Sequence, residues 1–326
     1  MIDGPMPTDQ QATMHLAVSL NITSGQPLGF SDLAGFAKQA EAAGLDMIVL
    51  DDSAPNSAGS SFFEATTLLA ALATVTSRIG LVAAASTVAH QPYNLARRFA
   101  SLDIISHGRA GWHATMAQAP GEAANFSRPD GFSDDVFRRR TQEYIGIVQR
   151  LWQGWDADAL LFDKAGGRFH DPEKMHLLDH KGEFFSVRGP LNVARSPQDT
   201  PVLVLSGLSE ADLDIAARTA DVVLLDRPTE DAKARHDDLK RRVVACGRDP
   251  GAVKLLLNVG ADVAANALET LFSSQSCDGF NIAIPPAAID GFIGRVLPEL
   301  QRRSLVRPDY PGTTLRSHLR LAGGAQ

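Results

Sequence analysis

Eight short apolar runs alternate with helical patterns along this chain, and this alternation limits the fold more than any other feature. The runs cover residues 15–20, 45–50, 79–85, 109–115, 201–206, 221–225, 253–259 and 279–284. Such an alternation is typical of βα units that share a parallel sheet. Because eight units follow one another with no linker-like change in composition, we expect an α/β fold of the (β/α)8 TIM-barrel type rather than a doubly wound sheet. The barrel would form one domain over residues 1–326.

Helical patterns between the runs show apolar residues every three or four positions, which predicts helices with one buried face. The predicted buried positions are Leu33, Phe36, Ala37 and Ala40 in one helix, Leu95, Phe99 and Leu102 in another, and Ile289, Phe292, Ile293, Val296, Leu297 and Leu300 in the last. Ser61 and Glu64 stand in S-x-x-E order before an apolar run, which predicts a capping box.

The pattern breaks once, between about residues 154 and 200, where Gly, Asp, Lys and His crowd together. Within this segment HKGEFFSVRG predicts a small hairpin. We interpret residues 154–200 as an insertion after the fourth βα unit. Segments of this length in a barrel often form a lid or a binding element, and we expect that role here.

The composition excludes several classes of protein. The formal net charge is −7, so the chain lacks the basic excess that nucleic-acid binding normally demands. It has only two cysteines, Cys246 and Cys277, and they are far apart, which supports neither a disulfide framework nor a zinc knuckle. No stretch reaches transmembrane length, so we expect no membrane partner and a cytoplasmic location.

The residues that follow the apolar runs form a largely polar set, at the end of a barrel where ligands bind. They are Asn21, Asp51, Asp52, Ser86, Thr87, His113, Thr115, Ser206, Gly207, Leu208, Ser209, Asp226, Asn258 and Pro285. The set contains no paired-carboxylate site, no G-x-S-x-G elbow and no phosphate-binding P-loop. Histidines in the insertion, His176 and His180 above all, have helical metal-ligand spacing, but Pro172 and Gly182 argue against a helix and we predict no metal site.

Two segments leave alternatives open. SGLSEAD, residues 206–212, could hold a phosphate on free amides at a helix start, or Ser209 could simply cap that helix with Asp212 closing the box. In HGRAGWHAT, residues 107–115, Trp112 and His113 could flank a planar ring, or they could be a core residue and an internal polar group.

Longer stretches carry a family resemblance. FFEATTLLAALATVTSRIGLVAAAST, QPYNLARRFASLDIISHGRAGWHAT, PGEAANF and GPLNVARSPQDTPVLVLSG resemble the bacterial-luciferase-like flavin monooxygenases, and so do DGFNIAIPP and VLPELQRRSLVRPDYPGTTLRSHL near the carboxyl terminus. Within that superfamily they look like the branch of nitrilotriacetate, pristinamycin and dibenzothiophene-sulfone monooxygenases. The resemblance runs from Leu45 to the end of the chain.

This resemblance implies a barrel that binds reduced FMN delivered by a separate flavin reductase. Oxygen then adds to the flavin, and the flavin hydroperoxide oxygenates a small organic substrate. A dry pocket is needed, because water promotes collapse of the peroxide. The apolar helix faces also make a homodimer an expectation.

The resemblance also implies which individual residues form the site. Asp52 matches the acidic residue near the flavin ring, Ser86 and Thr87 match the end of the third strand, and Ala84 stands where many members have threonine. His113, the expected catalytic residue, replaces an asparagine that contacts the ring, and we expect it to donate a hydrogen bond rather than act as a base.

The phosphate side departs further from the family pattern. Phe137 and Arg138 replace an Arg-Tyr pair, and Arg138 could bind the phosphate directly. Ser206, Gly207, Leu208 and Ser209 form the expected phosphate loop, with Leu208 in place of a first serine. Asp212 stands where glycine is common and would repel a phosphate by about 1 kcal/mol.

Two larger departures concern whole segments. The tryptophan, arginine and histidine usual after the first strand are absent from NITSGQPLGF, and the chain runs almost directly from Val263 to Leu268 where relatives carry a long segment.

The leading hypothesis is a two-component, FMNH2-dependent monooxygenase. The alternatives are a non-catalytic flavin- or ligand-binding barrel, an accessory subunit of a catalytic homologue, and a flavin or deazaflavin enzyme with a hydride acceptor.

Overall fold

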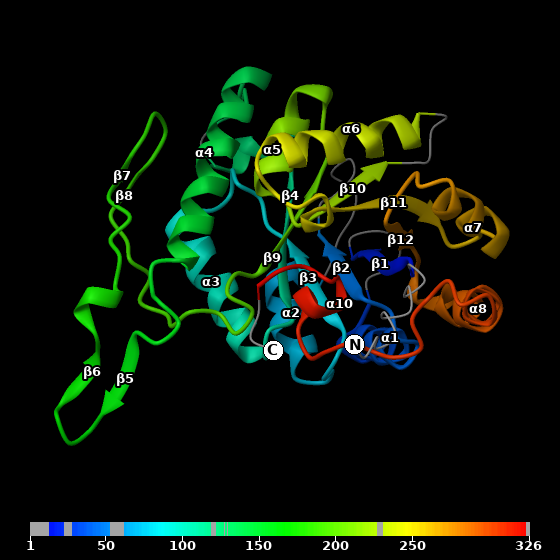
Figure 1. Cartoon of the computed structure of the whole chain (residues 1–326), viewed down its shortest axis with the longest axis horizontal. Coiled ribbons are helices and arrows are strands. Elements are labelled where there is room, and N and C mark those ends of the chain that lie inside the picture. Colours follow the sequence, from blue (N-terminus) through cyan, green and yellow to red (C-terminus); the bar gives the residue numbers. More distant parts are fainter. Residues whose placement is uncertain are drawn as a thin grey trace, which may run out of the picture.

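Eight parallel strands close into a barrel in the order β1-β12-β11-β10-β9-β4-β3-β2 (Figure 1). The structure is a computed structural model that describes residues 13–22, 28–52, 62–118, 122–126, 128, 130–226 and 231–323. The strands are β1 (His15–Asn21), β2 (Met47–Asp51), β3 (Gly80–Ala84), β4 (Ala110–Thr115), β9 (Val202–Ser206), β10 (Val222–Asp226), β11 (Lys254–Gly260) and β12 (Gly279–Ala283). Each predicted run coincides with one strand to within two residues, so the predicted (β/α)8 barrel is confirmed.

Helices follow the strands along the chain, and all but the last of them cover the outside of the barrel. They are α1 (Phe30–Ala42), α2 (Ala65–Ala73), α3 (Pro92–Ile105), α4 (Asp134–Trp152), α5 (Leu213–Thr219), α6 (Ala232–Ala245), α7 (Ala265–Ser273), α8 (Ile289–Arg295), α9 (Leu297–Arg302) and α10 (Leu315–His318). The predicted faces of α1 and α3 are buried. The last predicted helix is divided at Val296 into α8 and α9, where Pro298 in the first turn of α9 lacks the amide that a continuous helix requires.

The predicted capping box before α2 is wrong in its register. Glu64 is itself the N-cap, and its side chain accepts from the amide of Thr67 at 2.7 Å. Ser61 lies outside the described residues. A glutamate carboxylate at the helix start also faces the positive end of the helix dipole, so one residue serves both functions.

Side chains alternate along each strand between the helical shell and the barrel interior. The interior is filled with apolar side chains from every second strand position, among them Ala17, Met47, Val82 and Val204. The helix α10 closes the amino-terminal end of the barrel, because Leu315, Leu319 and Leu321 pack into the same cluster. Gly80 and Gly111 make room for this plug, since a Cβ on Gly80 would overlap Leu315.

The insertion leaves the barrel between α4 and β9 and forms two antiparallel hairpins, β5 (Leu160–Asp163) with β6 (Arg168–His170) and β7 (His180–Lys181) with β8 (Ser186–Val187). The second is the hairpin predicted from HKGEFFSVRG. Both project from the barrel beside α4 in Figure 1. The segment starts where α4 ends, opposite the carboxyl ends of the strands, and the β7–β8 hairpin returns to the first half of α4, where Glu143 accepts from the amides of Phe184 and Phe185 at 3.0 Å.

None of the helices in the described part of the chain combines the length and the apolar character that a bilayer span requires.

Candidate functional site

The barrel interior changes from apolar to polar toward the carboxyl ends of the strands, which we name the mouth. Strand register continues the inward alternation from Val49 to Asp51, from Val204 to Ser206 and from Leu224 to Asp226. His113 occupies the equivalent inward position on β4, between its neighbours β3 and β9. The predicted strand-end residues from these strands are therefore gathered on one side of the barrel.

His113 is a titratable group that faces the barrel interior at the mouth. Its Nε2 atom lies 2.7 Å from Ser206 Oγ, and its Nδ1 atom is buried with no hydrogen-bond partner among the described residues. Burial lowers the pKa of His113, although the carboxylates of Asp51 and Asp226 act in the opposite direction. The imidazole is therefore neutral at pH 7, and its unpartnered nitrogen can donate or accept one hydrogen bond.

A second polar group crosses the neighbouring strands. Asn258 Nδ2 donates to Asp226 Oδ1 at 2.9 Å, and Asn281 Nδ2 donates to Asn258 Oδ1 at 2.8 Å. Asn281 Oδ1 is buried without a partner in the described part of the chain. Sequence reasoning missed Asn281, yet a lone amide within the apolar strand GFNIA was a usable signal.

The loop after β9 combines features of both alternatives left open by the sequence. Ser209 caps the turn Glu210–Asp212, because Asp212 Oδ2 accepts from the Ser209 amide at 2.8 Å and from its hydroxyl at 2.5 Å. The predicted N-cap arrangement is therefore present. Gly207 has φ +65° and its added Cβ would lie 2.7 Å from Thr115 Oγ1, so only glycine fits this position.

Donors nonetheless remain at this loop. The amides of Gly207 and Leu208 have no hydrogen-bond partner within the residues that the structure describes. Arg138, from the start of α4, approaches the same loop and donates from Nε to Asp212 Oδ1 at 2.9 Å. This ion pair neutralises the carboxylate that was expected to repel a phosphate, and the two Nη groups of Arg138 are not used by it.

Three further predicted site residues make mainly local contacts. Asp52 Oδ2 accepts from the amide of Ala65 at 2.9 Å, and burial raises the pKa of its carboxyl group. Ser86 Oγ accepts from the amides of Val88 at 3.0 Å and Ala89 at 3.3 Å. Thr87 is buried, with its hydroxyl 3.4 Å from that of Thr141 on α4.

Trp112 and His113 point to opposite faces of β4 and do not flank a common ring. Trp112 is fully buried in the helical shell, where its Nε1 donates to the carbonyl of Ala85 at 2.9 Å. Of the two sequence interpretations, the core residue is the one observed for Trp112.

The insertion histidines have carboxylate partners of their own. His176 Nε2 lies 3.0 Å from Asp156 Oδ1, and His180 Nε2 lies 2.8 Å from Glu143 Oε1. No group of three or more metal-ligating side chains occurs in the described ranges.

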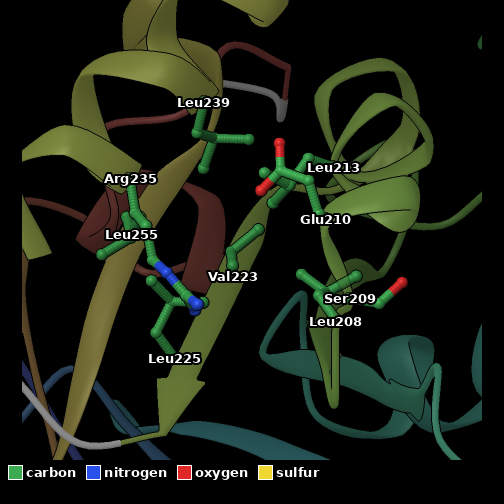
Figure 2. A pocket seen from close by; sticks show the side chains of 9 residues that line it. All are labelled: Leu208, Ser209, Glu210, Leu213, Val223, Leu225, Arg235, Leu239 and Leu255. Atoms are coloured by element: carbon green, nitrogen blue, oxygen red, sulfur yellow. The ribbon is translucent and has the colours of Figure 1, made fainter. Parts of the chain in front are cut away.

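A small hollow lies beside the loop after β9, between α5 and α6 (Figure 2). Its volume is about 10 Å³, which is the room of roughly one water molecule. Figure 2 shows leucine and valine side chains around it together with the charged Glu210 and Arg235, and it shows the Ser209 hydroxyl directed away from it. A larger hollow of about 360 Å³ lies where β11 runs on to α7, lined by Asp262–Asn266 and by residues of α8 and α9.

The residues at the mouth fit a flavin nucleotide. The buried His113 Nδ1 and Asn281 Oδ1 atoms have no hydrogen-bond partner among the described residues, and a polar ligand would supply one. The Gly207 cradle, the two loop amides that lack a partner in the described ranges, and the Nη groups of Arg138 suit a phosphate.

Comparison with known proteins identifies the family. Residues 7–271 match the model of the luciferase-like monooxygenases. The chain is 33% identical to N-acetyl-S-(2-succino)cysteine monooxygenase of Bacillus subtilis, over 87% of this chain and 88% of that protein. It is 32% identical to nitrilotriacetate monooxygenase component A of Aminobacter aminovorans, over 92% of each chain.

A third relative differs in its alignment. One of the proteins of the pristinamycin IIA synthase of Streptomyces pristinaespiralis is 36% identical, over 95% of this chain and 96% of that protein. The alignments with the first two relatives span 389 and 418 positions, more than the 326 residues of this chain, whereas that with the synthase protein spans 312. The first two relatives therefore carry residues that this chain lacks.

Solved structures confirm the architecture. A riboflavin lyase, solved with modified FMN and riboflavin, superposes with a TM-score of 0.87 at 23% identity over 95% of this chain and 96% of that one. A long-chain alkane monooxygenase gives 0.87 at 22% identity over 96% of each. The family match and the three relatives above 30% identity establish that this chain belongs to the luciferase-like monooxygenases, a family of flavin-dependent oxidoreductases.

Proposed function

We propose that this protein is the oxygenase component of a two-component system that uses reduced FMN and O2 to oxygenate a small organic substrate. The observation that carries the proposal is the position of His113, a neutral imidazole at the centre of the mouth with one nitrogen on Ser206 and the other unpartnered within the described residues. The loop amides and Arg138 lie on the β9 side of it, where they suit a phosphate.

Reduced FMN, delivered by a separate reductase in the cytoplasm, would supply the two electrons with which one atom of O2 enters the substrate and the other leaves as water. The chain's own residues would bind the flavin and orient it. Gly207, Leu208, Ser209 and Arg138 would hold the phosphate, with Ser209 acting through its contact with Asp212. Asp52, Ser86 and Thr87 would shape the edge of the mouth near the ring.

His113 would donate or accept one hydrogen bond at the flavin ring rather than act as a base. Its Nε2 contact with Ser206 fixes the ring orientation, and its lowered pKa keeps it uncharged, so that it adds no positive charge beside the reduced flavin. The buried amide of Asn281 offers a second polar contact in the same interior.

Anaerobic titration with reduced and oxidised FMN tests the proposal. We expect reduced FMN to bind, and oxygenated buffer then to produce the absorbance of a flavin hydroperoxide. Failure to bind reduced FMN, together with no flavin-dependent turnover, would contradict it. Sedimentation at several concentrations would test the expected homodimer.

A second candidate is a supporting subunit of a longer homologue. The observation that favours it is that this chain aligns within 312 positions with a protein named as one subunit of a synthase, and that another subunit of the same synthase is also similar, at 31% identity over 82% of this chain. The direct passage from β11 to α7 fits a site completed by a partner. Stable 1:1 association with a purified longer homologue from the same genome, combined with flavin binding only in the complex, would favour this candidate over the first.

A further inference from the structure

The first half of α4 carries two arginines to opposite sides of β4. Arg138 reaches the β9 side, where it pairs with Asp212. Arg140 reaches the β3 side, where its Nη1 donates to the carbonyl oxygen of Thr87 at 2.9 Å. Because β4 lies between β9 and β3, the two guanidinium groups flank the strand end that carries His113.

Arg140 differs from Arg138 in its electrostatic environment. No carboxylate in the described part of the chain lies within ion-pair distance of it, whereas aromatic rings surround it, with the centroids of Phe185 at 4.8 Å and Phe132 at 5.2 Å from its Cζ. Glu143, one turn along α4, is engaged by His180 and by the hairpin amides. Burial lowers the pKa of Arg140, although the negative charge of Glu143 acts in the opposite direction.

A second arginine lies beside the same aromatic ring as Arg140. Arg128 is exposed and its Cζ lies 4.6 Å from the centroid of the same Phe132 ring. Its charge lowers the pKa of Arg140 further. Like Arg140, Arg128 has no carboxylate partner among the residues the structure describes. Two like charges near each other repel, and an anion bound between them would stabilise both.

We do not expect the flavin phosphate to bind beside Arg128 and Arg140. The Gly207 cradle, the loop amides and Arg138 provide a phosphate site on the β9 side of His113. One phosphate cannot occupy both sides of β4, so the cations on the β3 side are left for a different anion at the same mouth.

We propose that Arg128 and Arg140 bind the carboxylate, or an equivalent oxyanion, of the substrate on the β3 side of the mouth. The identification of this anion as the substrate rests on the proposed function, whereas the anion site itself does not. Arginine suits this role because its planar fork binds both oxygens of a carboxylate. The aromatic rings fix the forks in place and reduce the entropy lost on binding.

Calorimetric titration with succinate, in the presence and absence of FMN, tests the inference. We expect Arg128→Met and Arg140→Met each to raise the succinate dissociation constant about tenfold or more, the effect of losing a charged hydrogen bond. Arg140→Lys should recover only part of the affinity, because the charge remains and the fork is lost. Arg128 is exposed, so its variant tests the site even if an Arg140 variant unfolds.

Arg218→Met is the matched control. Arg218 is exposed in the last turn of α5, at the end of the barrel opposite the mouth, and its loss changes the net charge by the same amount. It should leave succinate binding within about twofold.

Two results would overturn the inference. One is succinate binding that is absent, or unchanged in Arg128→Met. The other is a loss of affinity for FMN but not for riboflavin in that variant with succinate binding unaltered, which would make the flavin phosphate the ligand. A wild-type protein that binds succinate through these arginines but no FMN would instead contradict the proposed function alone.

Discussion

Arg138 Nε donates to Asp212 Oδ1 at 2.9 Å, and this ion pair joins the start of α4 to the turn after β9. The Asp212 side chain is only 5% exposed, so its charge would be costly without the guanidinium. From the sequence alone, we expected the Asp212 carboxylate to repel a phosphate. In the structure it orients Ser209 and Arg138 together, and the pair leaves no uncompensated negative charge facing the loop.

We predict that Arg138→Met weakens FMN binding by about tenfold or more, because the phosphate then faces a buried carboxylate without its partner. Riboflavin, which has no phosphate, should bind as before. The double variant Arg138→Met/Asp212→Asn should recover part of the FMN affinity, since the negative charge is removed as well. Fluorescence titration with both flavins measures these changes.

The control for that cycle is Arg139→Met, which removes an exposed arginine from the same helix. It should leave both flavin affinities within about twofold. If the double variant binds FMN no better than Arg138→Met, the phosphate does not sense Asp212 and lies elsewhere.

His113→Asn should preserve FMN affinity within about threefold. An asparagine amide can still meet the Ser206 hydroxyl and present one donor to the ring. His113→Leu should weaken binding more, because it leaves the Ser206 hydroxyl without its partner in a buried setting. Equal losses in the two variants, measured by the same titration, would show that hydrogen bonding at this position does not matter for flavin binding.

The fold was readable from the sequence because each strand buries both faces. Runs such as 45–50 and 201–206 are almost wholly apolar, since one face packs against helices and the other fills the barrel. Helix faces were predictable for the same reason. The division between α8 and α9 was missed because the apolar spacing continues through Val296 while Pro298 prevents a continuous helix.

The site was only partly readable. Strand register gathers His113, Ser206 and Asp226 at the mouth, as the barrel alone predicts. The pairing of Arg138 with Asp212, which lie 74 positions apart, depends on how α4 sits over the strands and has no local sequence signal. Arg140 escaped notice for a related reason, because a run of three arginines normally indicates a solvated helix face.

Leu315→Ala should lower the free energy of unfolding by about 2–5 kcal/mol, because Leu315 is fully buried in the plug that closes the barrel. Leu161→Ala is the control, since Leu161 is 36% exposed on the β5–β6 hairpin, and it should cost less than about 1 kcal/mol. Urea unfolding followed by tryptophan fluorescence measures both. A loss below about 1 kcal/mol for Leu315→Ala would mean that the barrel end closes without the plug.

The stability of the protein should fall as the pH drops below about 6.5, the ordinary pKa of histidine. Burial lowers the pKa of His318 to about 4, so between these values the unfolded chain binds a proton that the folded chain does not. The contribution of His318 to the free energy of unfolding is therefore fully present above the pKa that the histidine has in the unfolded chain. It is lost as the pH falls toward the pKa that the histidine has in the folded chain. His318 alone contributes up to about 3 kcal/mol of this loss, and His113 acts in the same direction.

His318→Gln separates this contribution from the rest. Glutamine can still donate to the carbonyl of Gly312, 3.2 Å from His318 Nε2, but it does not titrate. Urea unfolding at pH 7 and at about pH 4.5 should show a markedly smaller loss for this variant than for the wild type. His176→Gln, at a histidine whose side chain is 54% exposed, should retain the wild-type dependence. Parallel pH profiles for the wild type and His318→Gln would show that another group governs acid stability.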